Sequence, residues 1–306
     1  MGYYQEQLDH YLKILKTAGR KSSTIKQYSS DLQKFLVWLE TYKKEKSFSN
    51  LNSIDLQSYI DYLERSNLSI TTRKRLLSGV NKLLNLYNID TQVLSNRIKE
   101  YQRVPLRDSD FISENEMSKL LSSMKKNINS SARDELINRN LAIICLIRYY
   151  GFKPSDISKI NMEMVNLAQC SIDVLHEDRT VTYQLSEEHI QYIQNYLKSI
   201  DRMKRPRLKT KDPLFVAYFN LTNEFIYDYS EESPKRLSIR GIQEMIKDEV
   251  QLAGLRKISA KHLRNSCILY RLRRGDQDNK IQTYFRLSNT FSLHRYKVYI
   301  KANLSE

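Results

Sequence analysis

Three consecutive cations, Arg73, Lys74 and Arg75, carry a clear chemical signal. They follow the segment 69–72 (Ser-Ile-Thr-Thr), which is typical of a helix start, so we expect them on the first turn of a helix. The first amides of a helix have no intrahelical acceptor, and together with three cationic side chains they suit a phosphate group. The alternative is a solvated helix face, and the triplet alone does not decide between the two.

The whole chain carries a surplus of positive charge. Its 306 residues hold 50 Lys and Arg against 35 Asp and Glu, a net charge of +15. Such a balance favours nucleic acid or an acidic membrane surface as partner, the alternative being a basic protein that is merely soluble. The apolar stretch 141–152 is too short to span a membrane and contains Arg148, so we expect no membrane partner.

The three cysteines, Cys145, Cys170 and Cys267, are far apart and odd in number. They have neither metal-ligand spacing nor the pattern of a disulfide framework. We therefore expect no metal, no cofactor and a reducing, cytoplasmic compartment, with no apolar signal core at the amino terminus.

The pattern of the chain is mostly helical, with only seven glycines and five prolines. Apolar residues at helical spacing predict four or five helices in the first hundred residues, with starts near Ser22 or Ser23, Ser53 and Ser69. A polar, basic segment broken by Pro105 predicts a linker. We expect a helical domain over 1–98, a linker over 99–110 and a second domain over 111–306.

The second domain is expected to add a small β-sheet to further helices. Ser113 and Glu116 form the pattern of a capping box. Two β-rich runs, 171–175 and 180–185, predict a hairpin. Further helices are expected near 187–200, 238–253, 260–273 and 292–303.

Short motifs follow one another through both expected domains. The first domain holds Ser23-Thr24, Tyr28, Asp31-Leu32 and Phe35, followed by the segment 72–78. The second domain holds the segments 150–157 (YGFKPSDI), 213–215 (PLF), 258–266 (ISAKHLRNS) and 285–288 (FRLS), and then Tyr296. In order and spacing these motifs resemble the tyrosine recombinase (phage integrase) family over nearly the whole chain. The resemblance implies a helical core-binding domain followed by an α+β catalytic-like domain.

In that family a tyrosine attacks a DNA phosphodiester, arginines and histidines hold the non-bridging oxygens, and a hairpin lysine protonates the leaving oxygen. The matching positions here are Lys153, Arg179, Lys261, Arg264, Asn265, Leu287 and Tyr296. Only Arg264 and Tyr296 keep the family's residue type. Lysine lacks the planar fork of arginine, arginine cannot release a proton at physiological pH, and leucine offers no hydrogen bond.

These replacements predict that no catalytic residue is functional. Loss of one donor to a transition-state oxyanion costs about 3 kcal/mol, and loss of a general acid costs about 10²–10⁴ in rate. Four cations, Lys153, Arg179, Lys261 and Arg264, still suit phosphate binding.

Alternative roles stay open for several of these residues. Tyr296 is one of 21 tyrosines, so packing is as good an interpretation as a vestigial nucleophile. Lys153 could simply cap a helix, with Pro154 starting the next one. His262 and His294 could be offered as substitute acids, but a structural role for His262 and a surface position for His294 are preferred.

The resulting hypothesis is a sequence-specific binder of double-stranded DNA that represses transcription in the bacterial cytoplasm, associated with the nucleoid. It is similar to degenerate recombinases that act as lysogeny repressors in temperate phages of the SPbeta type. The expected DNA contacts are Arg73, Lys74, Arg75 and Arg240, together with the four pocket cations. An active recombinase using Tyr296 and a DNA-bending accessory factor are the alternatives, and an oligomer on DNA is compatible with all three.

One acidic segment, 223–232, lengthens a turn that is normally short in the family. It is interpreted either as a solvated loop or as the contact for a regulatory protein or peptide.

Overall fold

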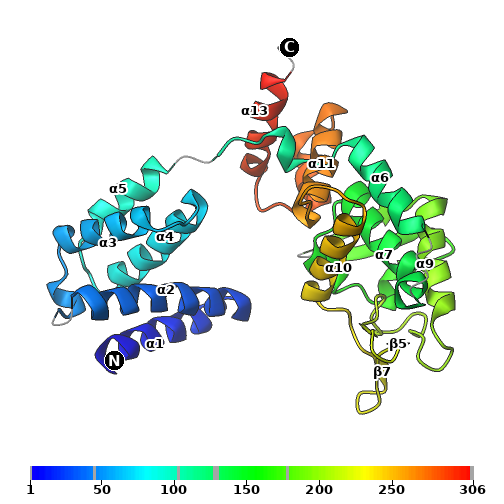
Figure 1. Cartoon of the computed structure of the whole chain (residues 1–306), viewed down its shortest axis with the longest axis horizontal. Coiled ribbons are helices and arrows are strands. Elements are labelled where there is room, and N and C mark those ends of the chain that lie inside the picture. The colour runs from blue at the N-terminus through cyan, green and yellow to red at the C-terminus, as the bar shows by residue number, and fades with distance from the viewer. Residues whose placement is uncertain (1, 44–45, 102–103, 127–130, 177–178, 304–306) are drawn as a thin grey trace. The chain divides into compact units, whose positions relative to one another are not determined.

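The computed structural model describes residues 2–43, 46–101, 104–126, 131–176 and 179–303. They form two compact units, Met1–Val104 and Pro105–Glu306 (Figure 1). The boundary between the units falls inside the expected linker. Residues on both sides of it are nevertheless ordered, since Tyr101 is buried in the first unit and Leu106 in the second.

The first unit is a bundle of five helices around one core. They are α1 (Gly2–Thr17), α2 (Ser22–Tyr42), α3 (Ser53–Arg65), α4 (Ile70–Leu86) and α5 (Gln92–Glu100). An aromatic group anchors the core, with ring centroids of Phe35 and Trp38 lying 4.8 Å and 5.0 Å from that of Tyr59. The expected starts at Ser53 and Ser69 are confirmed. Helix α3 begins at Ser53 after the capping residue Asn52, and Ser69 Oγ caps α4 by accepting from the Thr72 amide at 3.2 Å.

Helix α2 begins at Ser22, as expected, but neither Ser22 nor Ser23 is its N-cap residue, although the sequence pattern favours a serine there. The residue before the helix is Lys21, and its side chain caps nothing. The helix therefore depends on its buried face rather than on its first turn.

The second unit surrounds the buried helix α7. Its helices are α6 (Glu114–Lys125), α7 (Ser131–Tyr150), α8 (Pro154–Ile157), α9 (Glu187–Ser199), α10 (Ile239–Leu252), α11 (Ala260–Arg273), α12 (Asp278–Phe285) and α13 (His294–Ala302). Its main sheet is antiparallel, in the order β1 (Val165–Asn166), β2 (Ser171–His176) and β3 (Arg179–Gln184). The predicted hairpin is confirmed, and its turn, 177–178, lies outside the described residues.

Local signals in this unit behave as the sequence indicates. Ser113 and Glu116 exchange both hydrogen bonds of a capping box, at 2.9 Å and 3.2 Å. The helix expected over 292–303 begins as a 3₁₀ turn, Thr290–Leu293, before α13. The mainly helical class with a small sheet is confirmed.

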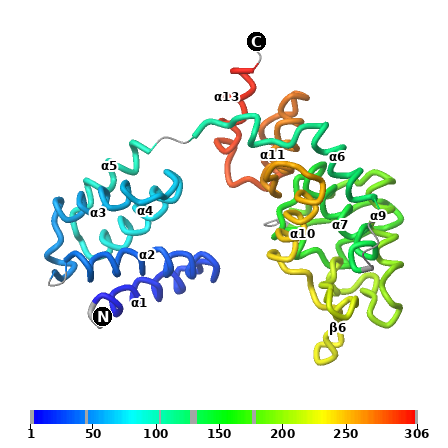
Figure 2. The backbone as a smooth tube through the Cα atoms, viewed as in Figure 1, coloured from blue at the N-terminus to red at the C-terminus, as the bar shows by residue number. Residues whose placement is uncertain are grey.

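The acidic segment 223–232 is not an irregular loop. It contributes to two short hairpins, β4 (Tyr218–Phe219) with β5 (Glu224–Phe225) and β6 (Tyr227–Asp228) with β7 (Ser233–Pro234). These hairpins extend from the rest of the second unit (Figure 2).

Within the described residues, no helix is long and apolar enough to cross a membrane. In the same residues no group of three or more His, Cys, Asp and Glu is placed to hold a metal ion.

Candidate functional site

The turn between α7 and α8 shapes the site through Gly151. This residue has φ +70° and ends α7, donating its amide to Ile147 O at 3.1 Å. A Cβ at Gly151 would lie 2.1 Å from Cε1 of Phe285, the last residue of α12. The chain on both sides of Lys153 is therefore held directly against the end of α12.

Arg264, on α11, joins these two segments. One end of its guanidinium donates to Gly151 O, and Nη2 donates to Phe285 O at 2.8 Å. Burial lowers the pKa of Arg264, which nevertheless stays cationic at neutral pH. The guanidinium thus holds two backbone turns together.

A second arginine in this cluster, Arg286, did not emerge from the sequence. It follows α12 in the left-handed conformation (φ +51°) and is only 7% exposed at its side chain. Its Nη2 donates to Asp156 Oδ2 at 2.7 Å, and the guanidinium lies 5.4 Å from the ring of Phe152. The one available signal was the resemblance of 285–288 to the motif Leu-Gly-His-Ser of the recombinase family, whose glycine stands where Arg286 is left-handed.

Lys153 lies at the start of α8, beside the ion pair of Arg286 and Asp156. Its amide donates to the same oxygen, Asp156 Oδ2, at 2.8 Å, and Pro154 occupies the first helical position. The side chain of Lys153 is exposed. Capping of α8 is therefore served by the backbone of Lys153, which leaves its charge at the surface.

The two other cations expected in the site, Lys261 and Arg179, lie at different distances from Arg264 and Arg286. Lys261 is exposed on the first turn of α11, one turn before Arg264, and has no ion pair or hydrogen bond among the described residues. Arg179 is exposed at the start of β3. It lies about 13 Å along the strand from Tyr183, whose ring is near Arg286. Lys153 and Arg264 thus lie at the same turn, Lys261 lies one helical turn away from Arg264 on α11, and Arg179 lies at the hairpin end.

Tyr296 lies inside the protein. Its side chain is buried in a cluster that includes Phe285 and Phe111, and the residue is 7% exposed. The hydroxyl donates to Asn265 Oδ1 at 2.7 Å, and Asn265 Nδ2 donates to Asp110 O at 3.0 Å. Burial raises the pKa of Tyr296. A nucleophile, by contrast, needs an accessible and activated oxygen.

Comparison with known proteins agrees with this architecture. Residues 6–88 match the family described as phage integrase, N-terminal SAM-like domain. No curated protein sequence matches the chain. Among solved structures, the Tn1549 transposon integrase (residues 82–397) in complex with circular intermediate DNA superposes with a TM-score of 0.67 and 14% identity, covering 95% of this chain and 94% of that one.

Two further structures are similar. The XerH site-specific recombinase bound to palindromic difH substrate gives a TM-score of 0.66 at 17% identity, covering 98% of this chain and 82% of that one. A lambda integrase (75–356) dimer bound to a COC' core site gives 0.62 at 12% identity, covering 95% and 94%. The chain has a tyrosine-recombinase fold.

On this fold the two histidines offered as substitute acids have other surroundings. His262 accepts the Ser259 amide at Nδ1 (2.9 Å) at the start of α11, and burial is the main cause of its lowered pKa. His294 is exposed and stacks on Phe291, 5.7 Å between centroids. Leu287 is half-buried against the same apolar cluster as Tyr296.

The cations at the start of α4 all have intramolecular partners. Arg73 Nε donates to Leu68 O at 2.9 Å and Lys74 Nζ to Tyr101 O at 2.6 Å. Arg75 pairs with Asp31 at 2.7 Å. The fourth expected contact, Arg240, is exposed at the start of α10 and lies 3.9 Å from Glu244.

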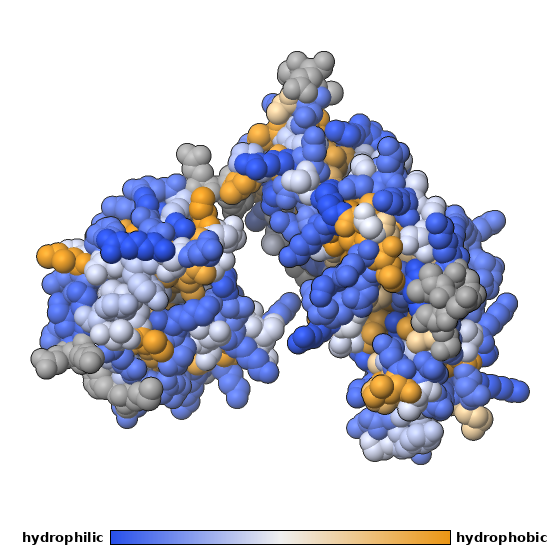
Figure 3. Space-filling model, in the orientation of Figure 1, coloured by the Kyte–Doolittle hydropathy of each residue, from blue (hydrophilic) through white to orange (hydrophobic). Residues whose placement is uncertain are grey.

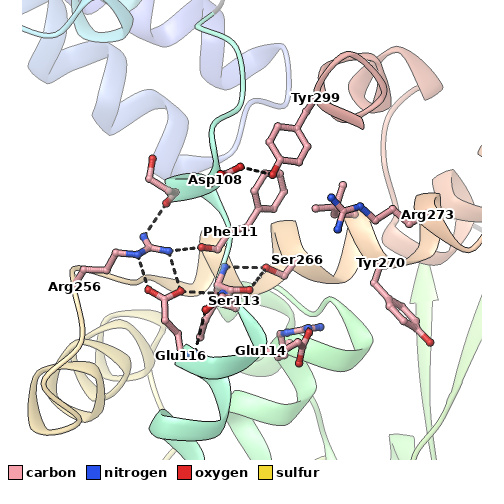
Figure 4. A pocket seen from close by; sticks show the side chains of 14 residues that line it. Asp108, Phe111, Ser113, Glu114, Glu116, Arg256, Ser266, Tyr270, Arg273 and Tyr299 are labelled. Atoms are coloured by element: carbon pink, nitrogen blue, oxygen red, sulfur yellow. Dashed lines mark hydrogen bonds and ion pairs between the residues drawn. The ribbon is translucent and has the colours of Figure 1, made fainter. Parts of the chain in front are cut away.

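A pocket of about 650 Å³ lies beside α11 and α13 and is lined by Phe111, Ser266 and Tyr299, among others (Figure 4). The hydroxyl of Tyr299 donates to Asp108 Oδ1 at 2.5 Å, which holds α13 to the segment before α6. Arg256 binds Glu116 at 2.7 Å and Ser109 O at 2.8 Å. The bond of Tyr299 holds α13 to the segment before α6, and the bonds of Arg256 fix that segment and α6 to the chain before α11.

Proposed function

We propose that this chain is a sequence-specific binder of double-stranded DNA that represses transcription and has lost the strand-exchange chemistry of the tyrosine recombinase family. Three features support DNA as the partner: the fold, the DNA bound in the similar structure of the Tn1549 transposon integrase, and a net charge of +15. Repression is supported by the resemblance to degenerate recombinases that serve as lysogeny repressors.

The observation that carries the loss of chemistry is the hydrogen bond of Tyr296 to Asn265 within an apolar cluster. A nucleophile needs a general base or a lowered pKa, and here burial raises the pKa instead. Arg264, the other residue that keeps the family's type, directs its guanidinium at two backbone carbonyls. Catalysis would require both groups to leave their present partners.

Phosphate binding makes smaller demands than catalysis. Lys153 and Lys261 present exposed charges next to the turn that Arg264 stabilises. The first turn of α11 also carries amides without intrahelical acceptors, which favour an anion beside Lys261. In the first unit, Arg73, Lys74 and Arg75 would exchange an internal partner for phosphate or a base edge.

The test combines three measurements on DNA from the neighbourhood of the chain's own gene. We expect a footprint and silencing of a promoter reporter. With the same DNA carrying a nick, we expect no covalent protein–DNA adduct on a denaturing gel. The variant Tyr296→Phe, which lacks the hydroxyl, serves as the control that cannot form an adduct through this residue. An adduct that disappears in Tyr296→Phe would identify an active recombinase, and a footprint without silencing would identify an accessory factor.

A further inference from the structure

The paired hairpins β4–β7 form an acidic surface on a basic protein. Residues 218–234 contain Glu224, Asp228, Glu231 and Glu232 and no cation. The hairpins are anchored, because Phe225 is buried and the backbone of Ile226 bonds to Ala217 O at 2.9 Å and to the Lys235 amide at 2.9 Å. A phosphodiester is a poor partner for such a surface, since the carboxylates repel it.

Large apolar side chains lie exposed on the same hairpins. The exposed fractions are 47% for Phe219, 86% for Leu221 and 77% for Tyr229. Phe219 and Tyr229 line a groove of about 270 Å³ that also includes Ile226 and Tyr227. Figure 3 shows hydrophobic atoms at the surface around these hairpins. Anchored aromatic side chains with accessible apolar area are characteristic of protein–protein contacts.

A strongly basic loop lies beside the acidic hairpins. Residues 202–211 hold Arg202, Lys204, Arg205, Arg207, Lys209 and Lys211. Lys204 pairs with Glu224 at 2.8 Å, and Arg207 Nη2 donates to Glu232 O at 3.3 Å, so the two segments are direct neighbours. Arg202, Lys209 and Lys211 are exposed without an ion pair in the described part of the chain.

We propose that this surface, formed by the hairpins of 218–234 and the loop 202–211, is the contact between two copies of this chain. A twofold contact brings the same surface of both copies together, so it must be self-complementary. Acidic and basic halves side by side meet that condition, because a twofold rotation places the acidic half of each copy on the basic half of the other. The exposed apolar residues of the hairpins supply area that leaves water on contact.

The contact is modest in size, so the free chain associates weakly. Copies that occupy neighbouring DNA sites would associate more strongly, because the DNA raises their effective concentration. The self-association itself does not require DNA, and its test therefore stands apart from the test of the proposed function.

Sedimentation equilibrium of the full chain without DNA tests the proposal. The acid reversal (Glu231→Lys with Glu232→Lys) and the base reversal (Lys209→Glu with Lys211→Glu) should each raise the dimer dissociation constant about tenfold or more. An equimolar mixture of the two variants should restore association, because every opposed pair is attractive again. Lys13→Glu with Lys16→Glu, exposed on α1, is the matched control and should leave association unchanged.

A second pair of substitutions tests the apolar part. Leu221→Ser with Tyr229→Ser should weaken association without changing charge, and both side chains are exposed, so the fold should persist. A strictly monomeric wild type, or a mixture of the reversal variants that fails to associate, would overturn the proposal. So would a base reversal that weakens binding to a single DNA site and leaves sedimentation unchanged, since the loop would then contact DNA.

Discussion

The hydroxyl of Tyr296 donates a 2.7 Å hydrogen bond to Asn265 Oδ1, and the same amide group donates to Asp110 O. The two bonds link α13 to α11 and α11 to the segment before α6. Tyr296, which the sequence motifs predict at the position of the recombinase nucleophile, thus links three parts of one unit through buried hydrogen bonds.

Replacing Tyr296 with Phe should lower the free energy of unfolding by about 1–2 kcal/mol, because Asn265 Oδ1 is left buried without a donor. DNA affinity should not change. Urea denaturation and footprint titration measure the two effects, with Tyr42→Phe, an exposed tyrosine of the first unit, as control. A loss of DNA affinity with unchanged stability would show that the hydroxyl contacts DNA.

Gly151→Ala should be among the most damaging single-methyl changes in the site. The left-handed backbone and the overlap with Phe285 should together cost about 2–4 kcal/mol. Gly275 has φ +84° and nothing within 4 Å of its added Cβ, so Gly275→Ala isolates the backbone component at about 1 kcal/mol. Equal losses for the two variants would show that the turn moves away from α12 easily.

The helix starts at Ser69 and Ser113 and the β2–β3 hairpin could be predicted because their signals lie within a few residues of sequence. A capping residue or an alternating strand pattern acts locally, so composition and spacing reveal it. The order of short motifs also predicted which segments form the candidate site, and that assignment stays a prediction.

Local sequence signals could not predict which cations have an intramolecular partner. Arg286 and Asp156 are 130 positions apart, and Arg75 and Asp31 are 44 apart. Whether a cation is free for phosphate depends on such long-range partners, which tertiary packing decides. The hydrogen bond of Tyr296 to Asn265 also depends on tertiary packing. In the sequence alone, both residues look like remnants of a motif.

Arg286 offers a test of backbone strain separate from charge. Arg286→Ala and Arg286→Gly both remove the ion pair with Asp156, but only glycine adopts φ +51° without steric cost. We expect the glycine variant to be more stable than the alanine variant by about 1 kcal/mol in urea denaturation. Identical stabilities would mean that the turn after α12 relaxes once the ion pair is gone.

His262 should make stability depend on pH near neutrality. Burial, reinforced by the neighbouring cations Arg256 and Lys261, lowers its pKa below the ordinary value of 6.5, so the unfolded chain binds a proton more readily than the folded one. Its contribution is complete above pH 6.5 and declines as the pH falls from there through the lowered folded value. Protonation also removes the acceptor for the Ser259 amide.

The matched variant is His262→Gln, which keeps an acceptor at this capping position and does not titrate. Burial also lowers the pKa of His189, so the informative quantity is the difference between wild type and variant in urea denaturation from pH 5 to 8. We expect the variant to lose less stability on acidification. Parallel curves would place the acid sensitivity elsewhere.

Neutralising Arg73, Lys74 and Arg75 together, each to Gln, should weaken DNA binding and reduce the salt dependence of log affinity by up to about three counterions. Lys13, Lys16 and Lys34, all exposed in the same unit, provide a control with the same change of charge. Because Arg75 pairs with Asp31, part of the effect can come from a weakened first unit. Adding Asp31→Asn removes the unpaired carboxylate and should restore stability without restoring affinity. If affinity returns with stability, the triplet supports the fold and does not contact phosphate.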